Sequence, residues 1–216
     1  MSALNLFGLE RSVYTRIARL VLEEKGVAYV LNEVEIFGPN GVPQEHLNRH
    51  PFGRVPAIEH EGFWLYETAA ISRYVDEAFP GPSLQPSEAR ARARMNQIVG
   101  LLDSYAYRPM VWGVFVERVR IPLNGGRADE AKITESISAA KTCLHALTAL
   151  ASCSPYFLGR ELTLADLHAF PILQYFSLAP EGRGLLVESP ALAQWLVSMR
   201  LRPSARRTIT KYEAGA

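Results

Sequence analysis

The stretch from His50 to Asp76 constrains the fold of this chain more than any other part of the sequence. A loop that ends at Val55-Pro56 leads into a short strand, a turn at Glu61-Gly62, a second strand over Phe63–Tyr66 and a helix that begins at Glu67-Thr68. Proline gives no N–H to a strand and steers the residue before it into an extended conformation, so a Val-Pro bond here is a candidate for the cis isomer. The backbone of Val55 would then face outward, where an extended peptide can pair with it. Free N–H groups, a hydroxyl and a positive dipole end converge at the helix start, which favours carboxylates.

The segments before this stretch predict a strand, a helix and a second strand, over Ala3–Phe7, Val13–Lys25 and Val27–Glu35. Apolar residues recur at helical spacing in the helix, and Gly26 stands where a C-cap prefers glycine. A strand–helix–strand unit implies a parallel pair of strands. Residues 1–80 therefore read as a βαβ unit followed by a ββα unit.

A change in the pattern after residue 80 predicts a domain boundary. Residues 81–87 are rich in proline and serine, which is typical of a linker. Strand signals nearly vanish in residues 88–216, so the fold class is α+β with an all-helical second domain. The predicted helices cover residues 88–119 with a bend near Pro109, 128–152, the segment from Thr163 onward with a kink at Pro171, 189–201 and 203–210.

The helix that begins at Thr163 carries a capping box. Thr163 can cap the helix while Asp166, at the third helical position, reaches back to the N–H of the cap residue. The pattern indicates a role in folding rather than in catalysis.

Composition excludes several classes of function. The net charge of +1 gives no electrostatic argument for nucleic acid or an anionic membrane, and no apolar run is long enough to span a bilayer. The two cysteines, Cys143 and Cys153, lie in one predicted helical stretch on different turns, which argues against a disulfide and shows no metal or redox pattern. A soluble protein in a reducing, cytoplasmic setting is expected.

Two motifs resemble a known family. The run Pro51-Phe52-Gly53-Arg54-Val55-Pro56, followed by Glu67-Thr68-Ala69-Ala70-Ile71, is similar to the glutathione-binding signature of the cytosolic glutathione transferases, with Thr68 where the family usually has serine. The resemblance covers nearly the whole chain and is more specific in the first domain. It implies a thioredoxin-like domain over residues 1–80 that binds glutathione, a linker over 81–87, and a helical domain over 88–216 with a pocket for an electrophile. It also suggests a bacterial, serine-type member, similar to the phi, tau, theta and zeta classes.

The resemblance directs attention to the start of the first helix for catalysis. A thiol of pKa about 8.5 is mostly protonated at neutral pH, and a hydroxyl at a helix N-terminus favours the thiolate. Ser12 fits the serine that opens this helix in the family, although a serine here is also an ordinary N-cap. Tyr14 is the alternative and Thr15 a third option. Family oxidoreductases use a cysteine at this helix start, and none occurs before Cys143, which argues against thiol–disulfide exchange.

The remaining glutathione contacts are implied by the resemblance. Val55 would pair its backbone with the cysteinyl unit, and Glu67 and Thr68 would hold the γ-glutamyl group. Arg54 would reach a carboxylate or simply be a solvent-facing charge. The position at which many phi-like members carry a basic residue or histidine for the glycyl carboxylate is Gly41. Three other residues could replace it: His46, Arg49 and Arg11.

The second substrate is less well defined by the sequence. A stripe of aromatic and apolar residues in the long helix suggests a hydrophobic electrophile, although such a stripe is also typical of a core. Its members are Tyr105, Tyr107, Met110, Val111 and Phe115. The leading hypothesis is a glutathione transferase without a metal; a glutathione-dependent isomerase or dehalogenase and a non-catalytic module of the same fold are the alternatives. A homodimer is expected, with Phe52 as an interface residue or as part of the core.

Overall fold

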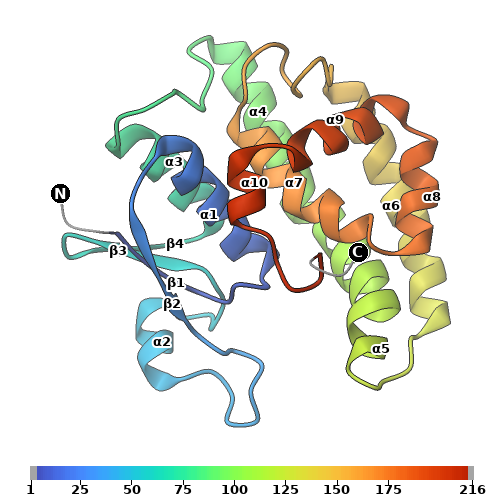
Figure 1. Ribbon diagram of the computed structural model, residues 1–216, viewed down its shortest axis with the longest axis horizontal. Coiled ribbons are helices and arrows are strands. Elements are labelled where there is room, and N and C mark those ends of the chain that lie inside the picture. Colours follow the sequence, from blue (N-terminus) through green and yellow to red (C-terminus); the bar gives the residue numbers. More distant parts are fainter. Residues whose placement is uncertain (1–3, 214–216) are drawn as a thin grey trace. The chain divides into compact units, whose positions relative to one another are not determined.

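The computed structural model describes residues 4–213 (Figure 1). Two compact units make up the chain: residues 4–83 together with 203–213 form the first, and residues 84–202 form the second. The first unit is therefore discontinuous, whereas the sequence predicts residues 88–216 as one domain. The difference arises because the segment after residue 202 makes its polar contacts with the first helix of the chain.

A four-stranded sheet forms the centre of the first unit. Its strands run in the order β2-β1-β3-β4, with β1 and β2 parallel and the other two neighbouring pairs antiparallel. The strands are β1 (Leu4–Gly8), β2 (Tyr29–Glu33), β3 (Ala57–His60) and β4 (Phe63–Tyr66). The predicted βαβ and ββα units and the thioredoxin-like fold are confirmed, and the second strand is shorter than predicted.

Three helices complete this unit around the sheet. Helices α1 (Val13–Lys25) and α3 (Thr68–Ala78) lie on one side and α2 (Gln44–Arg49) on the other (Figure 1). Helix α1 has the predicted bounds, α3 begins where it was predicted to begin, and Gly26 ends α1 in the left-handed conformation with φ 68°. The sequence analysis did not predict α2, because six residues are too few to show helical periodicity.

A buried ion pair holds the C-terminal end of α1 against α3. The ammonium of Lys25 donates to the carboxylate of Asp76 at 3.1 Å, to the backbone carbonyl of the same residue at 2.9 Å and to the carbonyl of Pro82 at 3.1 Å. The side chains of Lys25 and Asp76 are 3% and 4% exposed. Every proton of the ammonium thus has an oxygen partner, as a buried charge requires.

The second unit is helical. Its helices are α4 (Ala89–Leu101), η1 (Leu102–Ala106), η2 (Arg108–Arg120), α5 (Ile121–Leu123), α6 (Glu130–Leu150), α7 (Leu164–Phe176), α8 (Pro180–Val187) and α9 (Pro190–Arg200), and α10 (Pro203–Arg207) follows as part of the first unit. The predicted all-helical character is confirmed. Helix α8 is an additional element that the sequence pattern does not predict.

The long helix predicted from residue 88 differs in its winding. It is an α-helix up to Leu101 and then widens into two π-helical segments, in which N–H groups reach back five residues, as that of Ile121 reaches the carbonyl of Val116. Pro109 is the second residue of η2 and lies inside a continuous helical run, because Leu101, Leu102 and Tyr107 at the junctions between the segments all have right-handed helical backbones. Gly113 of this segment approaches α6 so closely that a Cβ atom would lie 1.9 Å from Oγ of Ser136.

Two predictions about the second unit have different outcomes. The capping box is confirmed: Asp166 accepts from the N–H of Thr163 at 3.0 Å and from its hydroxyl at 2.9 Å. The placement of both cysteines in one helix is wrong, because α6 ends at Leu150 and Cys153 lies beyond it with φ 50°. Both thiols are free.

Candidate functional site

The register of the sheet brings three predicted site segments to one end of the first unit. Phe7, near the end of β1, pairs with Ala57, the first residue of β3. Ala57 in turn pairs with Tyr66, the last residue of β4. The loop from β1 into α1, the Val55-Pro56 segment before β3 and the Glu67-Thr68 segment after β4 therefore all emerge from the same end of the sheet.

Ser12 is the N-cap of α1. Its backbone is extended, and its side-chain oxygen accepts a hydrogen bond from the N–H of Thr15 at 3.4 Å. The side chain is half-buried, as is that of Tyr14, whereas Thr15 is fully buried. A hydroxyl that accepts one hydrogen bond keeps its own proton to donate. Ser12 can thus cap the helix and donate to an anion at the same time.

The close approach of β1 and α1 depends on a glycine. A Cβ atom on Gly8 would lie 2.5 Å from Oγ1 of Thr15, which is shorter than any real contact of this kind. The Oγ1 atom is itself buried and has no hydrogen-bond partner among residues 4–213. The first turn of α1, with Ser12 at its start, is therefore packed directly against the end of β1.

The segment before β3 has the geometry predicted from its sequence. The Val55-Pro56 bond is cis, and among residues 4–213 no partner is found for the backbone N–H or C=O of Val55. Arg54, the residue before Val55, is held by His46 of α2. The Nε2 atom of His46 lies 2.7 Å from the carbonyl oxygen of Arg54 and must be the donor, since a carbonyl only accepts. The Arg54 side chain is exposed.

The start of α3 combines an unusual backbone conformation with an open helix end. Glu67 is exposed and has φ 71° and ψ 112°, outside the region that residues with a side chain prefer. Such a conformation costs on the order of 1–3 kcal/mol and is often found where a ligand binds. Thr68 follows as the first residue of the helix and is buried. The first N–H groups of a helix have no partner within it, so they are available to an anionic group.

His50 is a residue near the site to which the sequence analysis assigned no role. It is 2% exposed, and its ring centre lies 4.7 Å from that of Tyr66. Burial lowers the pKa of its imidazole, and the nearby charge of Glu67 opposes this shift. The position of His50 could have drawn attention to it. The related family usually has asparagine directly before Pro-Phe-Gly, and this chain has histidine there.

The three residues proposed to hold the glycyl carboxylate all have other partners. His46 is 1% exposed and bonded to the Arg54 carbonyl. Arg49 pairs with Glu45, and its guanidinium lies 4.2 Å from the centre of the Phe7 ring. Arg11 forms an ion pair with Glu35 at 2.6 Å. By contrast, the side chain of Arg54, in the loop before Val55-Pro56, is exposed.

The residues predicted to line a pocket for the electrophile lie in the second unit. Met110, Val111 and Phe115 are buried, and the Phe115 ring lies 4.6 Å from that of Tyr175. Tyr105 is 69% exposed. The hydroxyl of Tyr107 accepts from the indole N–H of Trp112 at 3.0 Å. The stripe thus divides between the interior and the surface of this unit, and its contact with a substrate stays a prediction.

Three further features concern possible partners. Within residues 4–213, no cluster of three or more histidine, cysteine or carboxylate side chains is arranged to hold a metal ion. No helix in the described part of the chain is both long and apolar enough to cross a bilayer. Phe52 is 70% exposed, so it does not belong to the core of its own unit.

A thioredoxin-like domain with a helical partner defines the class of fold, and comparisons with known proteins define the family. The glutathione S-transferase N-terminal domain model matches residues 6–83, and the corresponding C-terminal domain model matches residues 130–197. Glutathione S-transferase 4 of Zea mays is 30% identical over 215 residues, which cover 99% of this chain and 95% of the relative. Glutathione S-transferase F7 of Arabidopsis thaliana is 26% identical over 97% of this chain and 100% of its own.

Solved structures agree with these relatives. A glutathione S-transferase III in its apo form has a TM-score of 0.84 and 27% identity, covering 96% of this chain and 95% of that chain. Glutathione S-transferase I from maize, in complex with an atrazine glutathione conjugate, has a TM-score of 0.79 and 24% identity, with 96% of each chain covered. The chain belongs to the glutathione S-transferase family. The named relatives are plant proteins, and the comparisons do not support the bacterial origin expected from the sequence.

Proposed function

We propose that this glutathione S-transferase conjugates the thiolate of glutathione to hydrophobic electrophiles, and that Ser12 stabilises the thiolate. The observation that carries the proposal is the position of Ser12: it begins α1 at the end of the sheet where Val55-Pro56 and Glu67-Thr68 also emerge. Its hydroxyl accepts only the long bond from Thr15 N–H among residues 4–213, so its proton is available to an anion.

Glutathione would bind along these three segments. The unpaired backbone of Val55 offers an N–H and a C=O to the cysteinyl unit, as an added strand would use them. The first turn of α3 offers N–H groups and the Thr68 hydroxyl to the γ-glutamyl carboxylate, while the Glu67 carboxylate faces its ammonium. The exposed guanidinium of Arg54 is available to the glycyl carboxylate.

The chemistry requires little more than a lowered thiol pKa and a positioned electrophile. A hydrogen bond to a charged acceptor contributes about 1.5–3 kcal/mol, which corresponds to a thiol pKa lowered by about 1–2 units. The helix N-terminus adds about 0.3–1 kcal/mol in the same direction. Together these contributions keep bound glutathione largely ionised at neutral pH, ready to attack an electrophilic carbon.

The maize relative bound to an atrazine conjugate supports a hydrophobic, aromatic second substrate. The apolar side chains of η2, Met110, Val111 and Phe115, with Tyr105, are the residues we propose for this contact. We also propose a cytoplasmic homodimer in which the exposed Phe52 takes part in the interface, because its apolar ring would be removed from water there.

The proposal is tested by titrating the thiol of bound glutathione through the ultraviolet absorbance of the thiolate. Ser12→Ala is expected to bind glutathione with nearly unchanged affinity, to raise the bound thiol pKa by about 1–2 units and to lower kcat about 10- to 100-fold at neutral pH. Tyr14→Phe is the matched control and leaves both quantities unchanged. An unchanged titration in Ser12→Ala together with a shift in Tyr14→Phe would transfer the role to Tyr14.

Wild-type behaviour separates the classes of function. Retention on immobilised glutathione with turnover of an aromatic halide supports the transferase. Retention without such turnover points to a glutathione-dependent isomerase or dehalogenase, which needs the same thiolate. No retention at all indicates a non-catalytic module.

A further inference from the structure

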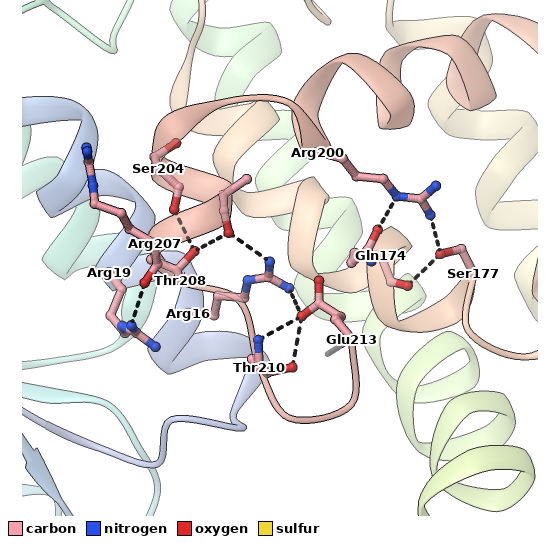
Figure 2. A network of polar contacts seen from close by, with 11 residues as sticks. Arg16, Arg19, Gln174, Ser177, Arg200, Ser204, Arg207, Thr208, Thr210 and Glu213 are labelled. Carbon is pink, nitrogen blue, oxygen red and sulfur yellow. Dashed lines mark hydrogen bonds and ion pairs between the residues drawn. The ribbon is translucent and has the colours of Figure 1, made fainter. Parts of the chain in front are cut away.

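The segment after α9 returns to the first unit and packs along α1. Figure 2 shows polar contacts between α1 and residues 203–213, among them those of Arg16 and Arg19. The Arg19 guanidinium donates to the carbonyl of Arg207 at 3.1 Å, and the Arg207 side chain in turn pairs with Glu23 at 2.5 Å. We call residues 203–213 the C-terminal clasp.

One of these contacts is buried, and it lies nearest the start of the helix. Nη1 of Arg16 is 2.6 Å from Oε1 of Glu213, with the two side chains 1% and 7% exposed. Nη2 of Arg16 also donates to the carbonyl of Ala205 at 3.5 Å. The same Glu213 oxygen accepts from the N–H and the hydroxyl of Thr210, at 3.1 and 2.8 Å. The Glu213 carboxylate is therefore oriented by Thr210 within the clasp as well as by its ion pair with Arg16.

The backbone of Arg16 connects this contact to Ser12. The Arg16 N–H donates to the carbonyl of Ser12 at 2.9 Å, which is the first helical hydrogen bond of α1. The preceding N–H, that of Thr15, donates to the Ser12 side-chain oxygen. Arg16 therefore has two roles: its backbone N–H makes the first helical hydrogen bond to Ser12, and its side chain is buried against the C-terminal clasp.

We propose that Arg16 and Glu213 are positioning residues for the Ser12 hydroxyl, so that the C-terminal clasp sets the geometry of the thiolate site in the proposed function. A buried guanidinium without its carboxylate would have to move toward solvent, because an unpaired buried charge is strongly destabilising. That movement would displace the first turn of α1, and the Ser12 oxygen would lose its alignment with the sulfur.

Two possible roles of Glu213, an electrostatic one and a positioning one, predict opposite shifts in the pKa of the bound glutathione thiol. If Glu213 acts through position, Glu213→Gln raises the pKa of the bound glutathione thiol, because the serine hydrogen bond weakens. If only charge matters, the same variant lowers that pKa, because the positive Arg16 is no longer neutralised. If the contact serves stability alone, the midpoint of unfolding falls and the thiol titration does not move.

The first experiment titrates the thiol of glutathione bound to the full-length protein. Glu213→Gln is expected to raise the bound thiol pKa by about one unit and to lower kcat about tenfold near neutral pH, with KM for glutathione within about twofold. Arg207→Gln is the matched control, because it removes the exposed contact between the same clasp and the same helix. It leaves thiol titration and kcat unchanged.

A second variant keeps the test valid if Glu213→Gln does not fold. Arg16→Met combined with Glu213→Leu leaves no buried charge but still lacks the connection, so it is expected to fold and to show the same upward shift. A lowered or unchanged thiol pKa in the folded variants would overturn the proposal.

Hydrogen exchange tests the connection without glutathione and so separates this proposal from the proposed function. In Glu213→Gln, the amides of Thr15 and Arg16 are expected to exchange at least tenfold faster, while that of Leu22 in the second half of α1 changes less than twofold. Uniform acceleration along α1, or none, would overturn the positioning role. If wild-type protein binds glutathione but leaves its thiol pKa at the free value, the proposed function fails, whatever the exchange shows.

Discussion

The buried pair Lys25–Asp76 makes a prediction whose size follows from its geometry. Its atoms are 3.1 Å apart and its side chains are 3% and 4% exposed. At an effective dielectric constant of about 20, two charges at this distance attract by about 5 kcal/mol. Removing both charges from water costs several kcal/mol each, so the pair as a whole contributes little net stability. If one partner is removed, the other charge remains desolvated but loses the attraction that offset the cost of burying it.

Lys25→Met is therefore expected to lower the free energy of unfolding by about 3–5 kcal/mol. Methionine keeps much of the apolar stem but removes the Lys25 ammonium from the buried Asp76 carboxylate. For a chain of this size the midpoint of thermal unfolding should fall by about 10 °C. The double variant Lys25→Met with Asp76→Leu replaces the pair by apolar side chains and is expected within about 1–2 kcal/mol of wild type.

Urea unfolding followed by circular dichroism measures the free energies of unfolding of wild type, Lys25→Met, Asp76→Leu and the double variant. Arg11→Met is the control, because it breaks an ion pair of comparable length, with Glu35 at 2.6 Å, whose side chains are 28% and 48% exposed. It should cost less than about 1 kcal/mol. A loss below about 1 kcal/mol in Lys25→Met, or a double variant as unstable as the two single changes added together, would refute the reasoning.

Three further predictions concern titratable groups. Each oxygen of Asp166 accepts two hydrogen bonds, including one from the indole of Trp195 at 2.9 Å. In Asp166→Asn the amide NH2 would face two buried donors, so the free energy of unfolding measured in urea should fall by about 2–4 kcal/mol. A fall of less than about 1 kcal/mol would contradict this. Burial lowers the pKa of His50, so the unfolded chain takes up its proton first and stability falls as the pH drops through about 6.5, by up to about 1.4 kcal/mol per pH unit. His50→Asn should flatten that slope, and an identical pH dependence would refute the assignment. Burial raises the pKa of Cys143, and burial with the charge of Asp166 raises that of Cys153 to about 11. Both thiols should therefore react more slowly with an alkylating agent near pH 8 in the native protein than in denaturant, by at least about a hundredfold for Cys153, and comparable rates would contradict this.

The parts of the fold that could be predicted are those with local signals. Gly26 ends α1 because its left-handed conformation suits glycine, and the turn at Glu61-Gly62 has positive φ at both residues. The capping box of α7 needs only two residues three positions apart. Each of these features is decided within a few residues, so the sequence contains the whole cause.

The parts that could not be predicted depend on distant contacts or on short elements. The Arg16–Glu213 pair joins residues 197 positions apart, and nothing near either residue indicates the other. The helix α2 has six residues and becomes stable through packing, with its Arg49 stacked on Phe7. Nothing in the local sequence indicates the π-helical winding of η2 or the close approach of its Gly113 to Ser136 of α6.

The site shows the same division. The motifs predict Ser12, Val55 and Thr68 as site residues, because each lies at or just before the start of a helix or strand where a recognisable residue type is required. The carboxylate clamp and the electrophile contacts lack such signals: Arg11 and Arg49 are held by other side chains, and Phe115 lies in the interior of its unit. Sequence alone does not distinguish a charged or apolar side chain that faces a ligand from one that faces its own chain.

The discontinuous first unit has a consequence for how the protein is made. Residues 4–83 leave the ribosome about 130 residues ahead of Glu213, which at ordinary rates of translation is a delay on the order of ten seconds. During that time Glu213 is not yet present to pair with Arg16, so the first unit is completed only when the final stretch of the polypeptide arrives. A fragment cut at residue 83 would therefore contain the whole sheet and still lack the piece that completes it.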